Sequence, residues 1–198
     1  MNTFVYLLRH GQVSGEPCLR GVTDDPVTEH GLMQMQQAVC NKEFDVVITS
    51  SLVRCSQFAT EYAATHNLPL IVEPALEEIN FGDWEGLPYS SLFNQKNSPA
   101  EQYFANPYLH SIPNGELTRD FDHRVYSAIH THVQQHLGQR MLIVTHAGVI
   151  RSLLAQCLGF GFVDKNTGYL PVKIEHAALI LFECFSNSDN QLTLTLSL

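Results

Sequence analysis

The fold is decided by the stretch Thr3-Phe4-Val5-Tyr6-Leu7-Leu8-Arg9-His10-Gly11. Its first part is rich in apolar, β-branched and aromatic side chains, which is typical of a buried strand, and it stops abruptly at a basic pair and a glycine. Two more apolar runs stop in the same way: Phe44–Thr49 before Ser50-Ser51-Leu52-Val53-Arg54, and Met141–Thr145 before His146-Ala147-Gly148. Such runs predict a parallel sheet whose strands end at one polar edge.

Helical patterns alternate with these strands. The clearest is Leu117–Leu137, an amphipathic segment that Gly138 is expected to close. The other expected elements are helices from Thr28 to about Cys40, from a cap at Ser50 or Ser51 through about His66, and over Val149–Leu158, and strands over Leu70–Val72, Ala178–Phe185 and Leu192–Leu196. This order predicts an α/β class, a three-layer doubly wound fold with a mostly parallel sheet and helices on both faces.

Residues 87–116 differ from the rest of the chain, with three prolines (Pro88, Pro99 and Pro107) and scattered aromatic side chains. We expect an irregular, partly helical insertion that lies over the site and shapes the substrate pocket. A chain of 198 residues is long enough for one sizeable core and short for two. We therefore expect a single domain over residues 1–198.

The charge balance limits the class of partner. Eleven Lys and Arg against 20 Asp and Glu leave a formal net charge of −9, which disfavours nucleic acid and anionic membranes as partners. The five cysteines are widely spread without a C-x-x-C pair, as expected of reduced thiols. No basic leader and no membrane-length apolar run is visible, so we expect a cytoplasmic protein.

The polar residues at the strand ends suit phosphoryl transfer. The arginines Arg9 and Arg54 match the geometry of phosphoryl oxygens, and with His146 they are suited to clamp the group. A neutral imidazole, His10, can attack phosphorus and form a covalent intermediate. A carboxylic acid must then protonate the leaving alkoxide, and the turn-rich segment Glu77–Glu85 supplies candidates, Glu78 or a neighbour. Any one of these residues taken alone more often has a structural role. Their occurrence together at the strand ends predicts a phosphatase.

Four motifs resemble the histidine phosphatase superfamily, also called phosphoglycerate-mutase-like. They are Leu8-Arg9-His10-Gly11; the segment Ser50–Ala59, which matches S-x-L-x-R-[CA]-x-x-[TS]-A; the segment Leu76–Gly86, which matches L-x-E-x-x-F-G-x-W-E-G; and the segment Val144–Arg151, which matches V-[ST]-H-[GA]-G-V-I-R. The resemblance implies that His10 is the phosphorylated nucleophile and that Glu78 is the proton donor. Because the two arginines and His146 already supply the cationic clamp and no chelating cluster is visible in the sequence, we expect no metal and no cofactor.

The segment Cys18–Val27 is most similar to the α-ribazole phosphatases, which act late in cobalamin nucleotide-loop assembly. The loop departs from the wider family, because Gln12-Val13 follows Gly11 where many members have Glu-Thr. We expect substrate contacts from Gln12, Arg20 and Gly21, and from Ala147. The predicted partner is a small-molecule phosphate ester, with monomer and homodimer both open.

Four alternative functions compete with this prediction. A phosphoglycerate mutase would use the same chemistry, but the 87–116 insertion holds a single lysine, Lys96, where more cations are expected. A broad-specificity phosphatase and a catalytically weak, phospholigand-binding member also remain open. A metal-binding protein fits the 10 histidines poorly, because His130 and His132 do not share a helix face.

Overall fold

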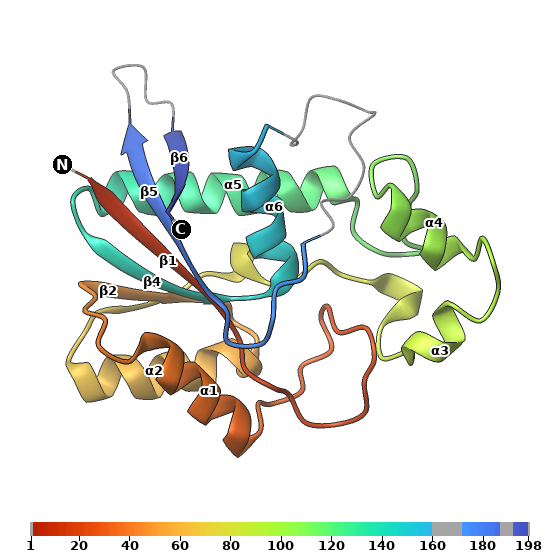
Figure 1. The fold of residues 1–198 in the computed structure, drawn as a ribbon, viewed down its shortest axis with the longest axis horizontal. Helices are drawn as coiled ribbons and strands as arrows, with labels where there is room; N and C mark the ends of the chain where they lie inside the picture. Colours follow the sequence, from red (N-terminus) through yellow and green to blue (C-terminus); the bar gives the residue numbers. More distant parts are fainter. Residues whose placement is uncertain (1, 160–171, 187–191, 198) are drawn as a thin grey trace.

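The computed structural model describes residues 2–159, 172–186 and 192–197 (Figure 1). Its centre is a six-stranded sheet with the strand order β3-β2-β4-β1-β5-β6. The strands are β1 Thr3–Arg9, β2 Val46–Thr49, β3 Leu70–Val72, β4 Arg140–Thr145, β5 Leu179–Ser186 and β6 Leu192–Ser197. The pairs β1–β4, β4–β2 and β2–β3 are parallel, whereas β5 is antiparallel to β1 and to β6. The predicted mostly parallel sheet is confirmed.

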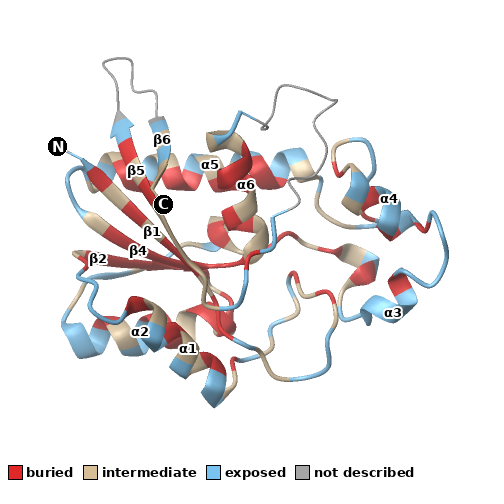
Figure 2. Ribbon diagram, in the orientation of Figure 1, coloured by how far each residue is buried: buried red, intermediate tan, exposed pale blue. Residues whose placement is uncertain are grey.

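Helices cover both faces of this sheet (Figure 1). They are α1 Glu29–Val39, α2 Val53–His66, α3 Tyr89–Leu92, α4 Pro99–Ala105, α5 Thr118–Gln135 and α6 Ala147–Cys157. Side chains of α1 and α2 pack in one core cluster, and those of α5 and α6 in a second. The two clusters take alternate residues of the central strands, which Figure 2 shows as buried. This is the predicted three-layer α/β arrangement.

Two predicted helix boundaries are wrong. Ser50 and Ser51 do not cap α2, whose N-cap is Leu52 without a side-chain hydrogen bond, because both hydroxyls contact the site, as described below. The helix α5 ends at Gln135 rather than near Leu137. Gly138 has a φ of 76° and belongs to the turn into β4, where its N–H donates to Thr3 Oγ1 at 2.9 Å. The predicted cap at Thr28 is confirmed, since its side chain accepts from Gly31 N.

The 87–116 segment is partly helical, as expected, and lies to one side of the sheet in Figure 1. It contains the short helices α3 and α4, and its side chains Leu92, Tyr103 and Ile112 join the core cluster of α5 and α6. Two short 3₁₀ helices, Pro74–Leu76 and Gly82–Trp84, precede it. None of the helices in the described ranges is both long and apolar enough to cross a membrane.

Candidate active site

Parallel pairing brings the two motif histidines together. Since β1 and β4 are neighbouring parallel strands, their carboxyl ends meet, and His10 and His146 follow them directly. The backbone N–H of His10 donates to the carbonyl of Thr145 at 2.9 Å. The two imidazole rings lie 5.4 Å apart between centroids. The predicted polar edge of the sheet is therefore formed by these two strand ends.

The hydrogen bond of His10 determines which of its nitrogens can attack. Nδ1 lies 2.9 Å from the carbonyl oxygen of Gly11, which can only accept, so Nδ1 carries the hydrogen. The neutral ring then has its lone pair on Nε2. Burial and the neighbouring Arg9 hold the pKa of His10 well below its usual range, so the ring is neutral at physiological pH. A neutral ring with a lone pair on Nε2 has the form that a nucleophile requires.

His146 uses both of its ring nitrogens. Its Nδ1 accepts from Arg54 Nε at 3.2 Å, and its Nε2 lies 2.7 Å from the hydroxyl of Ser50. Because Nδ1 accepts, the hydrogen of the neutral ring is on Nε2 and is donated to Ser50 Oγ. Burial and Arg54 hold the pKa of His146 well below its usual range. The neutral ring of His146 therefore links Arg54 to Ser50 through its two hydrogen bonds.

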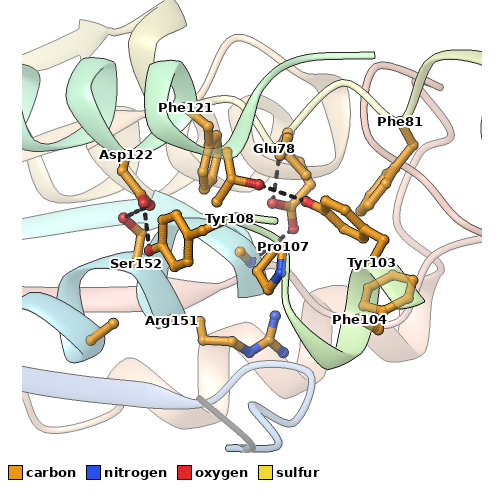
Figure 3. A pocket seen from close by; sticks show the side chains of 14 residues that line it. Glu78, Phe81, Tyr103, Phe104, Pro107, Tyr108, Phe121, Asp122, Arg151 and Ser152 are labelled. Atoms are coloured by element: carbon orange, nitrogen blue, oxygen red, sulfur yellow. Dashed lines mark hydrogen bonds between the residues drawn. The ribbon is translucent and has the colours of Figure 1, made fainter. Parts of the chain in front are cut away.

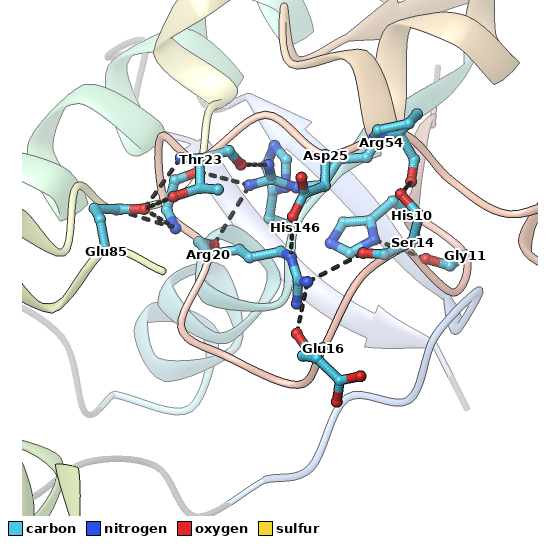
Figure 4. A network of polar contacts seen from close by, with 12 residues as sticks. His10, Gly11, Ser14, Glu16, Arg20, Thr23, Asp25, Arg54, Glu85 and His146 are labelled. Carbon is cyan, nitrogen blue, oxygen red and sulfur yellow. Dashed lines mark hydrogen bonds and ion pairs between the residues drawn. The ribbon is translucent and has the colours of Figure 1, made fainter. Parts of the chain in front are cut away.

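Arg54 is fully buried and directed toward the loop after β1, not toward solvent. Besides His146, its guanidinium donates to the carbonyls of Thr23 and Gly21, both at 2.7 Å (Figure 4). The backbone N–H groups of residues 21–23 donate in turn to the carboxylate of Glu85 at 3.0–3.1 Å. Arg54 and Glu85 thus hold this loop from its carbonyl and its amide side. Sequence reasoning did not predict this role for Glu85.

His10 opens onto a cleft of about 510 Å³. Of the residues predicted to bind substrate, Arg9, Gln12, Arg20 and Ala147 line it, whereas Arg54, Gly21 and His146 do not. Its described walls carry four cationic side chains, Arg9, Arg20, Arg151 and Lys173, and the carboxylate of Glu78. A chain with 11 Lys and Arg in all thus concentrates cations at this cleft. An anionic ligand is favoured there despite the acidic total charge.

Arg9 is the cation beside the nucleophile. It donates from Nη1 to the carbonyl of Ile174 at 2.5 Å, while its buried Nε has no hydrogen-bond partner within the described ranges. Burial lowers the pKa of Arg9 from its usual value, which is so high that the guanidinium remains charged. A buried unsatisfied donor costs free energy, and an acceptor oxygen on a ligand would satisfy it.

Arg20 lies at the mouth of the cleft and is held by its own loop. It forms an ion pair with Asp25 at 2.6 Å and donates to the carbonyls of Ser14 and Glu16 (Figure 4). His176, which sequence reasoning missed, also lines the cleft, with its ring centroid 5.8 Å from that of His10. Burial and Arg9 lower the pKa of His176 to about 4.

Glu78 is fixed at the cleft wall by the chain around it. Its carboxylate accepts from the backbone N–H groups of Gly148 at 3.0 Å and Ile79 at 3.1 Å. A Cβ on Gly148 would lie 2.0 Å from Glu78 Oε1, so any other residue at position 148 would displace this carboxylate. Arg124 donates to the carbonyls of Glu77 and Glu78 and pairs with Glu116 at 2.7 Å. Arg124 is a positioning residue that sequence reasoning missed.

Within the described residues, no group of three or more His, Cys, Asp or Glu is arranged to hold a metal ion. The neighbouring acid Glu77 does not line the cleft and accepts from the hydroxyl of Ser51. Glu85 is occupied by the amides of the loop. Of the three carboxylates considered from the sequence, Glu78 alone lines the cleft as described.

Comparisons with known proteins agree with this geometry. The family model of the histidine phosphatase superfamily (branch 1) matches residues 5–188.

The probable phosphoglycerate mutase GpmB of Yersinia pestis (strain Pestoides F) is 31% identical over 160 residues, 78% of this chain and 74% of that protein. Bacillus stearothermophilus YhfR matches with a TM-score of 0.83 and 24% identity, over 99% of this chain and 96% of that one. The alpha-ribazole phosphatase from Shigella flexneri matches with a TM-score of 0.74 and 26% identity, over 98% and 95%. With its motifs at one sheet edge, the chain belongs to the histidine phosphatase superfamily.

Proposed function

We propose that this protein is a metal-independent phosphomonoesterase that forms a phosphohistidine on His10. The observation that carries the proposal is the tautomer of His10, which leaves the lone pair on Nε2 of a ring that lines a cleft with four cations and the carboxyl group of Glu78. Relatives in the superfamily include both phosphatases and mutases by their names. Hydrolysis is our proposal for this chain.

The reaction proceeds in two balanced steps. Nε2 of His10 attacks phosphorus, the P–O bond to the alcohol breaks, and Glu78 in its acid form gives the leaving oxygen a proton. Water then attacks the phosphohistidine and the P–N bond breaks. Glu78 takes the proton from that water and returns to its acid form. Arg9, with its unsatisfied buried Nε, stabilises the charge on the phosphoryl oxygens.

Arg54 and His146 have an indirect part in this proposal. Their hydrogen bonds are already taken by the 21–23 loop and by Ser50, so they act as positioning residues. The positive charge of Arg54 also contributes to the lowered pKa of His10. A direct clamp on phosphate by Arg54 would require the loop to release it.

The best candidate substrate is α-ribazole 5′-phosphate. The similarity of the loop Cys18–Val27 to that branch and the likeness to the Shigella flexneri enzyme support this choice. A phosphoglycerate mutase is the second candidate, since GpmB is the relative with 31% identity. A mutase would need to keep the phosphoryl group for retransfer to an acceptor. The insertion residues Tyr89, Phe93 and Phe104 instead give the cleft an aromatic wall.

The test is turnover of purified protein on a panel of phosphomonoesters that includes α-ribazole 5′-phosphate and 3-phosphoglycerate. We expect release of inorganic phosphate, undiminished in excess EDTA, with α-ribazole 5′-phosphate among the best substrates. Activity that EDTA abolishes and only Mg²⁺ or Zn²⁺ restores would refute metal independence. Interconversion of phosphoglycerates without net phosphate release would identify a mutase. Binding without any turnover would identify a phospholigand-binding member.

A further inference from the structure

A second cavity adjoins the catalytic cleft on the side of Glu78. It has a volume of about 90 Å³ and lies between the insertion, α5 and α6 (Figure 3). Its walls are mostly apolar, formed by Phe81, Tyr103, Phe104, Pro107, Phe121 and Ala155. It shares Glu78, Phe81, Phe104 and Arg151 with the cleft, so the two spaces meet at the proposed acid.

The position of Glu78 determines what enters this cavity. A general acid must lie within hydrogen-bond reach of the oxygen that it protonates. In a phosphate monoester that oxygen is bonded to the first carbon of the alcohol. The alcohol part of the substrate therefore starts beside Glu78, which lines both the cleft and the cavity.

The far end of the cavity is polar. Asp122 is buried there, and each of its carboxylate oxygens accepts one hydroxyl hydrogen, from Ser152 at 2.5 Å and from Tyr108 at 2.8 Å (Figure 3). All three residues line the cavity. Burial raises the pKa of Asp122, and the two hydroxyl hydrogen bonds oppose that rise. Burial and Asp122 raise the pKa of Tyr108, so its hydroxyl keeps its hydrogen.

The hydroxyl hydrogens of Ser152 and Tyr108 are therefore not available to a ligand. A serine or tyrosine hydroxyl has one hydrogen, and both hydrogens are donated to Asp122. What remains toward the cavity is oxygen lone pairs, which accept hydrogen bonds but cannot donate them. The complementary ligand group is a hydrogen-bond donor.

We propose that this cavity binds the part of the substrate alcohol next to the ester oxygen, and that it selects alcohols whose first few atoms form a short apolar segment ending in a hydroxyl or N–H donor, while the rest of a larger alcohol lies in the cleft. The proposal rests on the phosphomonoesterase function argued above. The size supports a small group, because the cavity of about 90 Å³ is smaller than a cavity of roughly 150 Å³ that binds benzene. A short aliphatic chain or the edge of one ring fits the smaller space.

The test compares kcat/KM for ω-hydroxyalkyl phosphates with ω-methoxyalkyl and n-alkyl phosphates of matched length. A hydroxyl that donates to a charged group is expected to give a preference of about 10-fold or more over the methoxy compound, which can only accept. The free alcohols, as products, should inhibit the wild-type protein in the same order. This inhibition tests the cavity without any substituted variant.

The Asp122→Asn variant tests the residue itself, because its amide N–H₂ donates where the carboxylate accepted. In this variant, kcat/KM should be about equal for the hydroxyl and the methoxy compounds. Tyr103→Phe is the matched control: it removes a tyrosine hydroxyl from the same cavity, but one that contacts Thr118 at 3.1 Å. That variant should keep the preference.

The outcomes separate this proposal from the proposed function. Turnover of all three phosphate series with equal kcat/KM, or a preference that Asp122→Asn leaves unchanged, would overturn the cavity assignment and leave the phosphomonoesterase intact. No turnover of any phosphate ester would refute the proposed function, on which this assignment rests.

Discussion

The ends of β1 and β4 carry the same kind of residue and differ in how they use it. His10 and His146 follow neighbouring parallel strands. Burial is the main cause that holds the pKa of both histidines well below the usual range. His10 is bonded through Nδ1 to a carbonyl and lines the cleft, whereas His146 is bonded through both nitrogens and is fully buried. Similar positions thus give a proposed nucleophile at one strand end and a support at the other, because the hydrogen-bond partners differ.

The most severe test of this difference is removal of each ring. His10→Ala should lower kcat by roughly 10⁴- to 10⁶-fold, as expected when a covalent nucleophile is lost. His146→Ala should lower it far less. Labelled substrate followed by an acid-free quench should trap label on the wild type and on His146→Ala, and none on His10→Ala, with the label labile to acid and stable to base. Comparable turnover by His10→Ala would place the nucleophile elsewhere.

The second test concerns the two adjacent acids, of which Glu78 lines the cleft and Glu77 does not. Glu78→Gln should lower kcat for alkyl phosphates by about 10²- to 10⁴-fold, because their alkoxide needs a proton. It should affect p-nitrophenyl phosphate much less, since that phenolate leaves unaided. Glu77→Gln is the control and should give a smaller loss that is equal on both substrates. An equal loss on both substrates for Glu78→Gln would indicate a structural role.

The third test compares the contribution of the buried Arg54 to stability with that of Arg140 at the protein surface. Arg54→Met leaves the carbonyls of Gly21 and Thr23 without their donor and should lower the free energy of unfolding by about 3 kcal/mol. Denaturant titration measures this change. Arg140→Met, which removes an exposed arginine paired with Glu43 and Asp45, should cost much less. A similar cost for both variants would show that Arg54 is not a buried anchor.

The smallest expected effect is on the pH dependence of stability. The folded-state pKa values of His10 and His146 lie below the unfolded value near 6.5, so the unfolded chain takes up protons that the folded chain does not. The free energy of unfolding should therefore fall as pH drops below about 6.5, by up to about 1.4 kcal/mol per pH unit for each histidine. Urea titrations of the wild type and of His146→Gln measure the slope, which should be shallower in the variant. An identical slope would mean that His146 is protonated in the folded state.

Much of the site was predictable from local patterns. Three apolar runs that end in polar residues led to the α/β class, to the shared sheet edge, and to Arg9 and His10 at that edge, whereas Glu78 was implied by the family resemblance. These predictions succeed because the carboxyl ends of parallel strands meet at one edge whatever their side chains contact. The predicted caps at Ser50 and Ser51 failed, because those hydroxyls contact His146 and Glu77 instead.

The different roles of the polar residues at that sheet edge depend on contacts between distant parts of the chain. Arg9 meets the carbonyl of Ile174, 165 positions away, and Arg54 meets His146, 92 positions away. The tautomer of His146 follows from such partners, Arg54 and Ser50, which no local spacing encodes, whereas that of His10 follows from its neighbour Gly11. Local sequence therefore places polar groups at strand ends through backbone periodicity. The folded chain then assigns each one its hydrogen-bond partners, and with them its charge and its access to substrate.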